Sequence, residues 1–297
     1  MATRDAVRVR PTGGPSDVAQ RVRDALIADD SLGWRGFGSQ ILILTPPALL
    51  YFLVRDLASG QEHEAFANAS SIVDLQKSLG LDWEATFQQR ILDLDWLIAF
   101  VNWIYIYGHF PLLIVALILL FGLSRPQFRT LRNALIASGA IGLVCFALYP
   151  VAPPRLFAPD EFFDSLGELS RSYRILQNPS LTNQFAAVPS FHVGWNLLVA
   201  VAVWRSTRSR VLRTAAVVFP CLMIVAVLLT ANHWILDIVA GAAVAAFGVG
   251  AAALFDRWVV PRMRRQPAAE AACESADAGC CDGPCGGDVD TDLATSV

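Results

Sequence analysis

Long apolar runs separated by short, arginine-rich connectors constrain this chain more than any other feature. Each run is close to the roughly 20 residues that an α-helix needs to cross about 30 Å of hydrocarbon. Hydrophobic residues make up 55% of the 297 residues and charged residues only 16%, too apolar a composition for an ordinary soluble domain. The sequence therefore predicts an all-α membrane protein, a six-transmembrane helix bundle. The expected spans are about 39–54, 96–123, 131–149, 189–204, 214–231 and 234–255.

The first of these runs differs from the others because Pro46 and Pro47 interrupt it. Proline removes a backbone donor and bends a helix, so the run predicts a kinked or tilted crossing helix. A half-inserted segment is the alternative.

Basic residues predict the orientation of the chain, since lysine and arginine concentrate on the cytoplasmic side of short connectors. With the amino terminus inside, most of the 23 basic residues fall on the inner side, in residues 1–37, the connectors 125–132 and 205–213, and the segment after 256. The outer segments carry basic residues at a much lower density. The sequence predicts an integral plasma-membrane protein with both termini in the cytoplasm. Arg129 and Arg132 then lie on the inner side as membrane anchors, about 30 Å from any outer site.

The segments outside the spans divide into three parts. Residues 1–37 carry no continuous apolar core and are expected to form a disordered cytoplasmic extension, followed by a membrane domain over 38–258. Within 62–95, helical spacing of apolar residues on both sides of an LGLD break predicts two interfacial helices on the outer leaflet. They either form a wall of a substrate entry or simply cover the bundle. The net charge of −3 offers no support for a nucleic-acid partner.

The tail over 259–297 contains the stretch CESADAGCCDGPCGG. Clustered cysteines suit a soft metal, but the stretch has no histidine and no zinc-finger spacing. Its Ala, Gly, Asp and Ser content buries too little apolar surface to offset ordering. We expect a disordered cytoplasmic tail.

Three polar motifs lie at the outer ends of the predicted spans. The fourth span begins in AAVPSFHVGW, which places Pro189, Ser190 and His192 at the mouth of a helix. Free backbone N–H groups at a helix start make an anion site, so a phosphate fits beside Ser190. Proline is also at home in a first helical turn.

The second motif is TANHWILDIVAG, in which His233 and Asp237 are four residues apart. On a helix this spacing puts both side chains on one face, so the carboxylate can accept a proton from one imidazole nitrogen while the other points elsewhere. A carboxylate-oriented histidine is a recurring nucleophile or base. The pair is equally consistent with a polar contact at a helix end.

The third motif is YPVAPPRL, where three prolines stop the third span and Arg155 follows. A guanidinium matches phosphate oxygens with a bidentate fork and stays charged. Alternatively, Arg155 snorkels to lipid headgroups. Taken together, the three motifs supply an anion clamp, a nucleophile with its orienting group, and a proton donor at one membrane depth.

PSFH, followed some forty residues later by H-x-x-x-D and preceded by a proline-flanked arginine, resembles the type-2 phosphatidic acid phosphatase superfamily. The resemblance covers about residues 96–255. It implies that His233 attacks phosphorus to form a phosphohistidine, that Asp237 orients it, and that His192 protonates the leaving oxygen. Arg155 and Ser190 would hold the phosphate, without a metal or another cofactor. The implied partner is a lipid phosphate or phospholipid, in an enzyme that is a phosphotransferase or phosphatase.

The motifs depart from the common pattern of that superfamily. Leu148 stands where a lysine is usual, Ala226 and Val227 replace a Ser-Arg pair, and Phe191 replaces a glycine. With two phosphate-binding cations missing, the chain is more similar to the branch of the inositol phosphorylceramide synthases. That branch transfers a phospho-headgroup from a lipid to an acceptor alcohol. Asn232 would then supply a neutral phosphate contact, although helix capping is its simpler role.

A further polar group occurs inside the second span, in NWIYIYGHFP. Asn102, Tyr105 and His109 share a face by helical spacing, and polar groups in the bilayer usually face a cavity or a partner. We expect them to line the substrate pocket, and an interhelical hydrogen-bond network is the alternative.

The sequence thus predicts a metal-independent lipid phosphotransfer enzyme whose site faces the extracytoplasmic side. Headgroup transfer is the preferred reaction and lipid phosphate hydrolysis is the alternative. A lipid carrier or scaffold without catalysis is the rival from another class.

Overall fold

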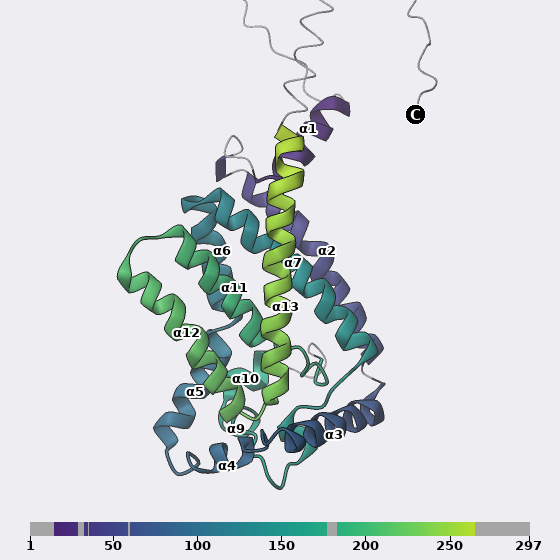
Figure 1. The fold of residues 1–297 in the computed structure, drawn as a ribbon, viewed down its shortest axis with the longest axis vertical. Helices are drawn as coiled ribbons and strands as arrows, with labels where there is room; N and C mark the ends of the chain where they lie inside the picture. The colour runs from purple at the N-terminus through teal and green to yellow at the C-terminus, as the bar shows by residue number, and fades with distance from the viewer. Residues whose placement is uncertain (1–14, 29–32, 35, 59, 177–182, 265–297) are drawn as a thin grey trace, which may run out of the picture.

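The computed structural model describes residues 15–28, 33–34, 36–58, 60–176 and 183–264 (Figure 1). Within these ranges the fold is helical and has no β-strand; an isolated bridge joins Val151 and Ala186. Four helices are long and apolar enough to cross a membrane, which indicates an integral membrane protein. They are α2 (Gly36–Ala58), α7 (Arg125–Leu148), α12 (Arg210–Leu229) and α13 (Ile235–Leu254), which continues through a π-helical turn, Phe255–Val259, to Arg264.

The second predicted span is not one helix but two. Helix α5 (Asp95–Tyr107) and helix α6 (Phe110–Leu123) meet at a bend of 47°, and together they meet the length and hydropathy of a fifth span. Gly108 ends α5, and Pro111 in the first turn of α6 lacks the N–H that a continuous helix needs. The break therefore follows from the local sequence.

The fourth predicted span, about 189–204, corresponds to α11 (Phe191–Ser206), which has 16 residues. At 1.5 Å per residue it reaches about 24 Å, short of the hydrocarbon thickness. The described structure thus supports four or five spans rather than the six predicted. Helix α2 runs through Pro46 and Pro47 as one helix of 23 residues, packed on α7.

The centre of the bundle is formed by α7, α11 and α13. Helix α13 packs along α7 and α11, and α11 also packs on α12 (Figure 1). Helices α11 and α13 lie close together at Gly194 and Gly241, where a Cβ added to Gly194 would lie 2.6 Å from the Gly241 carbonyl oxygen. Any side chain at this crossing would push the two helices apart.

Short helices close one end of the bundle, at the bottom of Figure 1. Helices α3 (Glu62–Ser78) and α4 (Glu84–Gln89) occupy the segment in which two helices were predicted, with the break at Leu79–Trp83. Three more short helices, α8 (Pro154–Phe157), α9 (Ser165–Leu169) and α10 (Arg171–Leu176), lie between α7 and α11 in the chain. Buried apolar residues of α3 pack on Trp234 and on the Val151–Ala152 segment.

The opposite end of the bundle carries the helix α1 (Pro15–Leu26) and the end of α13 (Figure 1). Part of the amino-terminal segment, expected as a disordered extension, is therefore helical. Its carboxyl end packs against the bundle, because Ala25 in the last turn and Ile27 and Ala28 just after it are buried. Residues 1–14 and the cysteine-rich tail lie outside the described residues.

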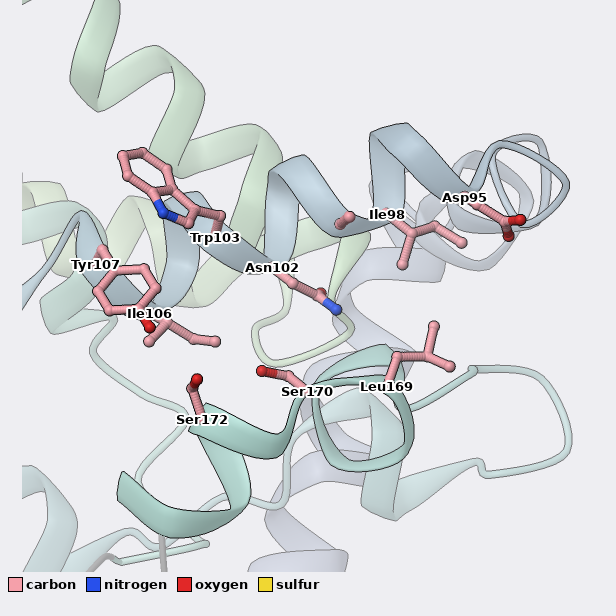
Figure 2. A pocket seen from close by; sticks show the side chains of 10 residues that line it. Asp95, Ile98, Asn102, Trp103, Ile106, Tyr107, Leu169, Ser170 and Ser172 are labelled. Carbon is pink, nitrogen blue, oxygen red and sulfur yellow. The ribbon is translucent and has the colours of Figure 1, made fainter.

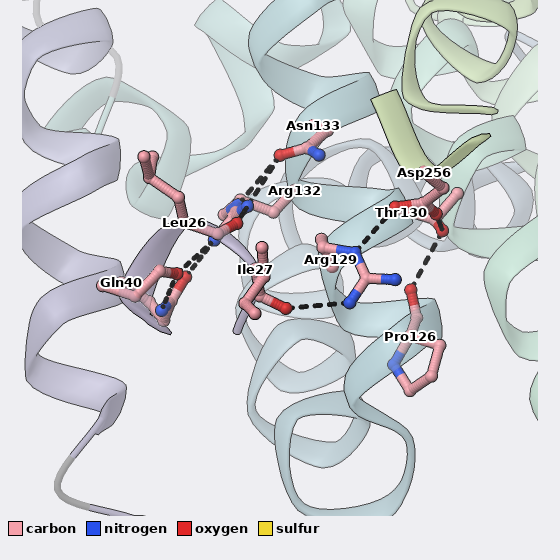
Figure 3. Close-up of polar contacts among 10 residues, drawn as sticks. Leu26, Ile27, Gln40, Pro126, Arg129, Thr130, Arg132, Asn133 and Asp256 are labelled. Carbon is pink, nitrogen blue, oxygen red and sulfur yellow. Dashed lines mark hydrogen bonds and ion pairs between the residues drawn. The ribbon is translucent and has the colours of Figure 1, made fainter. Parts of the chain in front are cut away.

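Two buried arginines of α7 attach α1 to the bundle (Figure 3). Arg132 donates to the carbonyl oxygens of Ala25 (3.2 Å) and Leu26 (2.5 Å) and also to the Gln40 side chain. Arg129 donates to the Ile27 carbonyl (2.8 Å) and pairs with Asp256 at 2.6 Å. The carbonyls at the end of a helix have no partner within it, so the guanidinium groups act as its cap. Both arginines are therefore buried and cap the end of α1.

Candidate active site

His233 and Asp237 meet at the start of α13, but not on one helical face as the sequence suggested. The helix begins at Ile235, so His233 precedes it. The Asp237 carboxylate accepts from the Trp234 backbone N–H at 2.7 Å and lies 3.4 Å from His233 Nδ1. Because Asp237 caps the start of α13, its carboxylate is held next to the His233 imidazole. Asp237 is fully buried, and its Oδ1 has no partner among the described residues.

The proton position on His233 follows from a second contact. His233 Nδ1 lies 2.9 Å from the carbonyl oxygen of Ala187. A carbonyl oxygen only accepts, so Nδ1 carries the proton in the neutral ring. The Nε2 lone pair is therefore left free to attack an electrophile, which is the tautomer that a nucleophilic histidine requires.

His192 lies opposite, in the first turn of α11, with its ring centroid 5.6 Å from that of His233. Ser190 is the residue before the helix, and its backbone N–H donates to the Asp237 carbonyl at 3.0 Å, which ties the starts of α11 and α13 together. That amide is thus not available to a phosphate, whereas the first-turn amides that follow it have no partner within the helix. The buried Ser190 hydroxyl has no partner among the described residues.

Arg155 is held beside the loop that carries His233. Its backbone N–H donates to the Ala231 carbonyl at 3.0 Å, and its Nε donates to the Asn232 side-chain oxygen at 3.0 Å. Asn232 thus orients the arginine rather than capping α13. Asp164 lies 3.7 Å from Arg155 Nη1.

Tyr173 of α10 is hydrogen-bonded to Arg155, and burial raises the pKa of the Tyr173 hydroxyl above its usual value. The hydroxyl therefore stays neutral and adds no charge beside the guanidinium. Together with Asn232 and Asp164 it fixes the direction of the arginine fork.

The helices α3 and α4 stabilise this end of α13. Gln76 accepts from the Leu236 N–H at 3.0 Å, and Glu84 accepts from the Ile235 N–H at 3.3 Å. Both side chains are buried and are hydrogen-bonded to each other. Since the first amides of a helix lack internal partners, α3 and α4 act as a cap that positions His233 and Asp237.

The three polar residues of the second span separate into two groups. Tyr105 and His109 contact His192, with ring centroids 4.2 Å and 4.3 Å from its own. Asn102 instead donates to the Ser165 carbonyl at 3.0 Å and accepts from the Ser165 hydroxyl at 2.9 Å. For Asn102 the structure shows the interhelical hydrogen bonds that were the alternative to a pocket role.

Asn102 also borders a groove between α5 and the helices α9 and α10 (Figure 2). The groove has a volume of about 480 Å³, and its wall on α5 includes Ile98, Trp103 and Ile106. Ser170 and Ser172 stand on the opposite side.

Several residues that shape the site gave no signal in the sequence. Asp164 and Tyr173 come from the long segment after Arg155, which contains no recognisable motif. The Ala187 carbonyl, which sets the tautomer of His233, is a backbone group, so it cannot be recognised from the type of residue in the sequence. Trp195 stacks on His109 and was read as part of an apolar run.

The fold and the site define a helical membrane protein with two facing histidines, a buried carboxylate and an anchored arginine. The model of the PAP2 superfamily matches residues 70–251, and the chain belongs to this superfamily. Its members are generally metal-independent phosphatases or phosphotransferases. No curated protein and no solved structure matches the chain significantly.

Proposed function

We propose that this protein transfers a phospho-headgroup between lipids through a phosphohistidine at His233. The observation that carries the proposal is the bond of His233 Nδ1 to the Ala187 carbonyl at 2.9 Å, with Asp237 at 3.4 Å. Because the carbonyl only accepts, this contact favours the tautomer with the proton on Nδ1 and leaves Nε2 as the nucleophile. The nearby carboxylate then compensates the positive charge that develops on the ring as the N–P bond forms.

The proposed reaction has two steps. His233 Nε2 attacks phosphorus, and the bond to the leaving lipid oxygen breaks as His192 donates a proton to that oxygen. In the second step an acceptor hydroxyl attacks the phosphohistidine, the N–P bond breaks, and His192 takes the hydroxyl proton back. Water in place of the alcohol gives hydrolysis.

Arg155, the Ser190 hydroxyl and the free first-turn amides of α11 are proposed to bind the phosphate oxygens. Fixed donors of this kind stabilise charge in the transition state without reorganisation. We propose that Asn232 contributes by orienting Arg155. The unpartnered Ser190 hydroxyl supports this assignment, since a buried polar group without a partner is costly unless a ligand satisfies it.

The preference for a phosphodiester donor rests on charge. A phosphodiester carries one negative charge, whereas a phosphomonoester carries about 1.5 to 2 near pH 7. The positions of the missing cations are apolar here: Leu148 is 77% exposed at the end of α7, and Ala226 and Val227 are buried in a hydrophobic cluster. A site with fewer cations suits the smaller charge of the diester.

A product analysis tests the proposal. Purified protein in lipid nanodiscs is incubated with headgroup-labelled phosphatidylinositol and candidate acceptor lipids that carry a hydroxyl. We expect a new labelled phosphodiester lipid and an acid-labile label on the protein that is absent from His233→Ala. Release of labelled inositol phosphate alone would show that water replaces the acceptor lipid and that the reaction is hydrolysis. Full activity of His233→Ala would contradict the phosphohistidine mechanism.

We also propose that the site faces the extracytoplasmic side of the plasma membrane. The distribution of arginine supports this, and α1 and the end of α13 lie at the opposite end of the bundle from the site (Figure 1). In a variant without native cysteines, Asp160→Cys should react with a membrane-impermeant maleimide in intact cells, while Arg208→Cys should react only after lysis. The reverse pattern would overturn the topology.

A further inference from the structure

Two rings from the second span, those of Tyr105 and His109, stack against the imidazole of His192. The plane of Tyr105 is inclined by 21° to that of His192 at a centroid distance of 4.2 Å, and the plane of His109 by 33° at 4.3 Å. Contacts of this kind restrict the tilt of the ring and leave its nitrogen-bearing edge open. No hydrogen bond to a ring nitrogen of His192 occurs within the described residues. Stacking is therefore what holds this imidazole.

Both rings are themselves firmly placed. Tyr105 and His109 are 6% and 4% exposed. Trp195, one turn after His192 on α11, stacks on His109 at 5.7 Å, and its indole N–H donates to the Ser138 hydroxyl of α7 at 3.2 Å. Tyr105 contacts the ring of Tyr173, which is hydrogen-bonded to Arg155.

The bend in the second span explains how both rings reach one imidazole. Tyr105 belongs to the last turn of α5, and His109 precedes α6. The bend of 47° lies between them, so each ring approaches His192 from a separate helix. A Cβ at Gly108 would clash with the Ile104 carbonyl oxygen and would also crowd the Phe219 and Met223 side chains of α12, so this position needs glycine.

We propose that Tyr105 and His109 are positioning residues that keep His192 aimed at the leaving oxygen, an inference that rests on the proposed function. His233 is oriented by hydrogen bonding to Ala187 and Asp237, and His192 is oriented by stacking. The two rings touch neither the phosphorus nor the leaving group. Their effect on the reaction passes through the proton that His192 donates as the bond from phosphorus to the lipid oxygen breaks.

A comparison of two leaving groups isolates this role. Phosphatidylinositol expels a diacylglycerol alkoxide, which needs a proton, whereas the p-nitrophenyl ester of inositol phosphate expels a phenolate that leaves without one. Both form the same phosphohistidine. If hydrolysis is the observed reaction, phosphatidic acid and p-nitrophenyl phosphate make the equivalent pair.

The variants are Tyr105→Leu and His109→Leu, which remove the flat rings, and Tyr105→Phe and His109→Phe, which keep them. General acid catalysis contributes about 10²–10⁴-fold. In single-turnover experiments, we expect each leucine variant to slow release of the diacylglycerol by about 10- to 100-fold, with the affinity for the substrate nearly unchanged, and to change release of the phenolate less than about threefold. The phenylalanine variants should retain most of the activity. His192→Ala should show the largest loss on the alkoxide substrate relative to the phenolate substrate.

The matched control is Phe110→Leu, which removes an exposed ring that contacts His109 and Trp195 but not His192. Equal losses on both substrates in the leucine variants would show a merely structural role and overturn the proposal. A loss in His109→Phe as large as in His109→Leu would also overturn it, since the imidazole itself would then be needed. His233→Ala must be inactive on both substrates; if it is active, the proposed function fails rather than the stacking role.

Discussion

Two buried polar clusters occupy opposite ends of the bundle, and they differ in how their groups are paired. At the α1 end, Arg129 and Arg132 bind helix carbonyls, Gln40 and the Asp256 carboxylate (Figure 3). At the other end, the Ser190 hydroxyl, Asp237 Oδ1 and His109 Nδ1 are buried without a partner in the described part of the chain.

The pairing of the charged groups distinguishes a structural cluster from a functional one, although Asn133 Nδ2 beside Arg132 is also buried without a partner among the described residues. Buried polar groups are costly unless they are paired, so paired groups contribute to the fold. Unpaired ones persist where a ligand or a reaction completes them. Charge alone does not identify the site, because the two most buried arginines lie at the end without the histidines.

The largest effect is expected at the site when the orienting carboxylate loses its charge. Asp237→Asn keeps the size and the capping acceptor for the Trp234 N–H, but no longer compensates charge on His233. By analogy with the orienting aspartate of a catalytic triad, kcat should fall about 10³-fold or more. The measurement is steady-state transfer in nanodiscs, with exposed Asp160→Asn as control. Activity within tenfold of the unmodified protein would contradict the role of Asp237.

At the paired end, Arg132→Met should act on stability and not on chemistry. The variant leaves the Leu26 carbonyl and the Gln40 side-chain oxygen without the Arg132 donor, at about 1–3 kcal/mol for each unsatisfied group, and a total of about 3 kcal/mol after relaxation. The Ala25 carbonyl keeps the N–H of the Gln40 side chain. Scanning fluorimetry should show a lower apparent Tm, and limited proteolysis should cut α1 sooner. The turnover of the folded fraction should be unchanged.

Arg208→Met, at an exposed position of the same end, is the matched control for this variant. A change in KM for the phospholipid in Arg132→Met, at unaltered Tm, would assign this cluster a binding role and break the contrast between the two ends.

The phosphate contact at Arg155 is expected to contribute less than Asp237. Arg155→Gln should lower kcat/KM about 10²-fold, the scale of one transition-state donor. Asn232→Ala should give a smaller loss in the same direction, because the guanidinium remains but loses its Nε acceptor. Exposed Arg171→Gln controls for charge at this end. Unchanged kinetics in Arg155→Gln would show that the arginine only holds the α8 and α9 segment in place.

The smallest effect is expected for the Ser190 hydroxyl. Ser190→Ala should raise KM for the donor lipid about tenfold, since one neutral hydrogen bond contributes about 1–1.5 kcal/mol. Stability should rise slightly or stay constant, because the buried hydroxyl has no partner to lose. Ser71→Ala on the exposed face of α3 is the control. A clear loss of Tm in Ser190→Ala would instead assign the hydroxyl to the fold.

Most of the helices were predictable because each apolar run is a local property of the chain. The bend between α5 and α6 has local causes, Gly108 and Pro111. The hydropathy is continuous across both residues, however, so it predicts one span. The buried state of Arg129 and Arg132 was not predictable, since it depends on the last turn of α1 packing against α7. Nor was the split of Asn102 from Tyr105 and His109, which depends on where α9 lies.

The helical membrane class and the candidate site residues His192, His233, Asp237 and Arg155 can be read from the sequence alone, because hydropathy and motif spacing are local properties of the chain. How those residues contact one another depends on the packed helices. The tertiary structure placed the Ala187 carbonyl on His233 Nδ1, Asn232 on Arg155, and two rings on His192. Such contacts join residues tens of positions apart, so they exist only after the helices have packed.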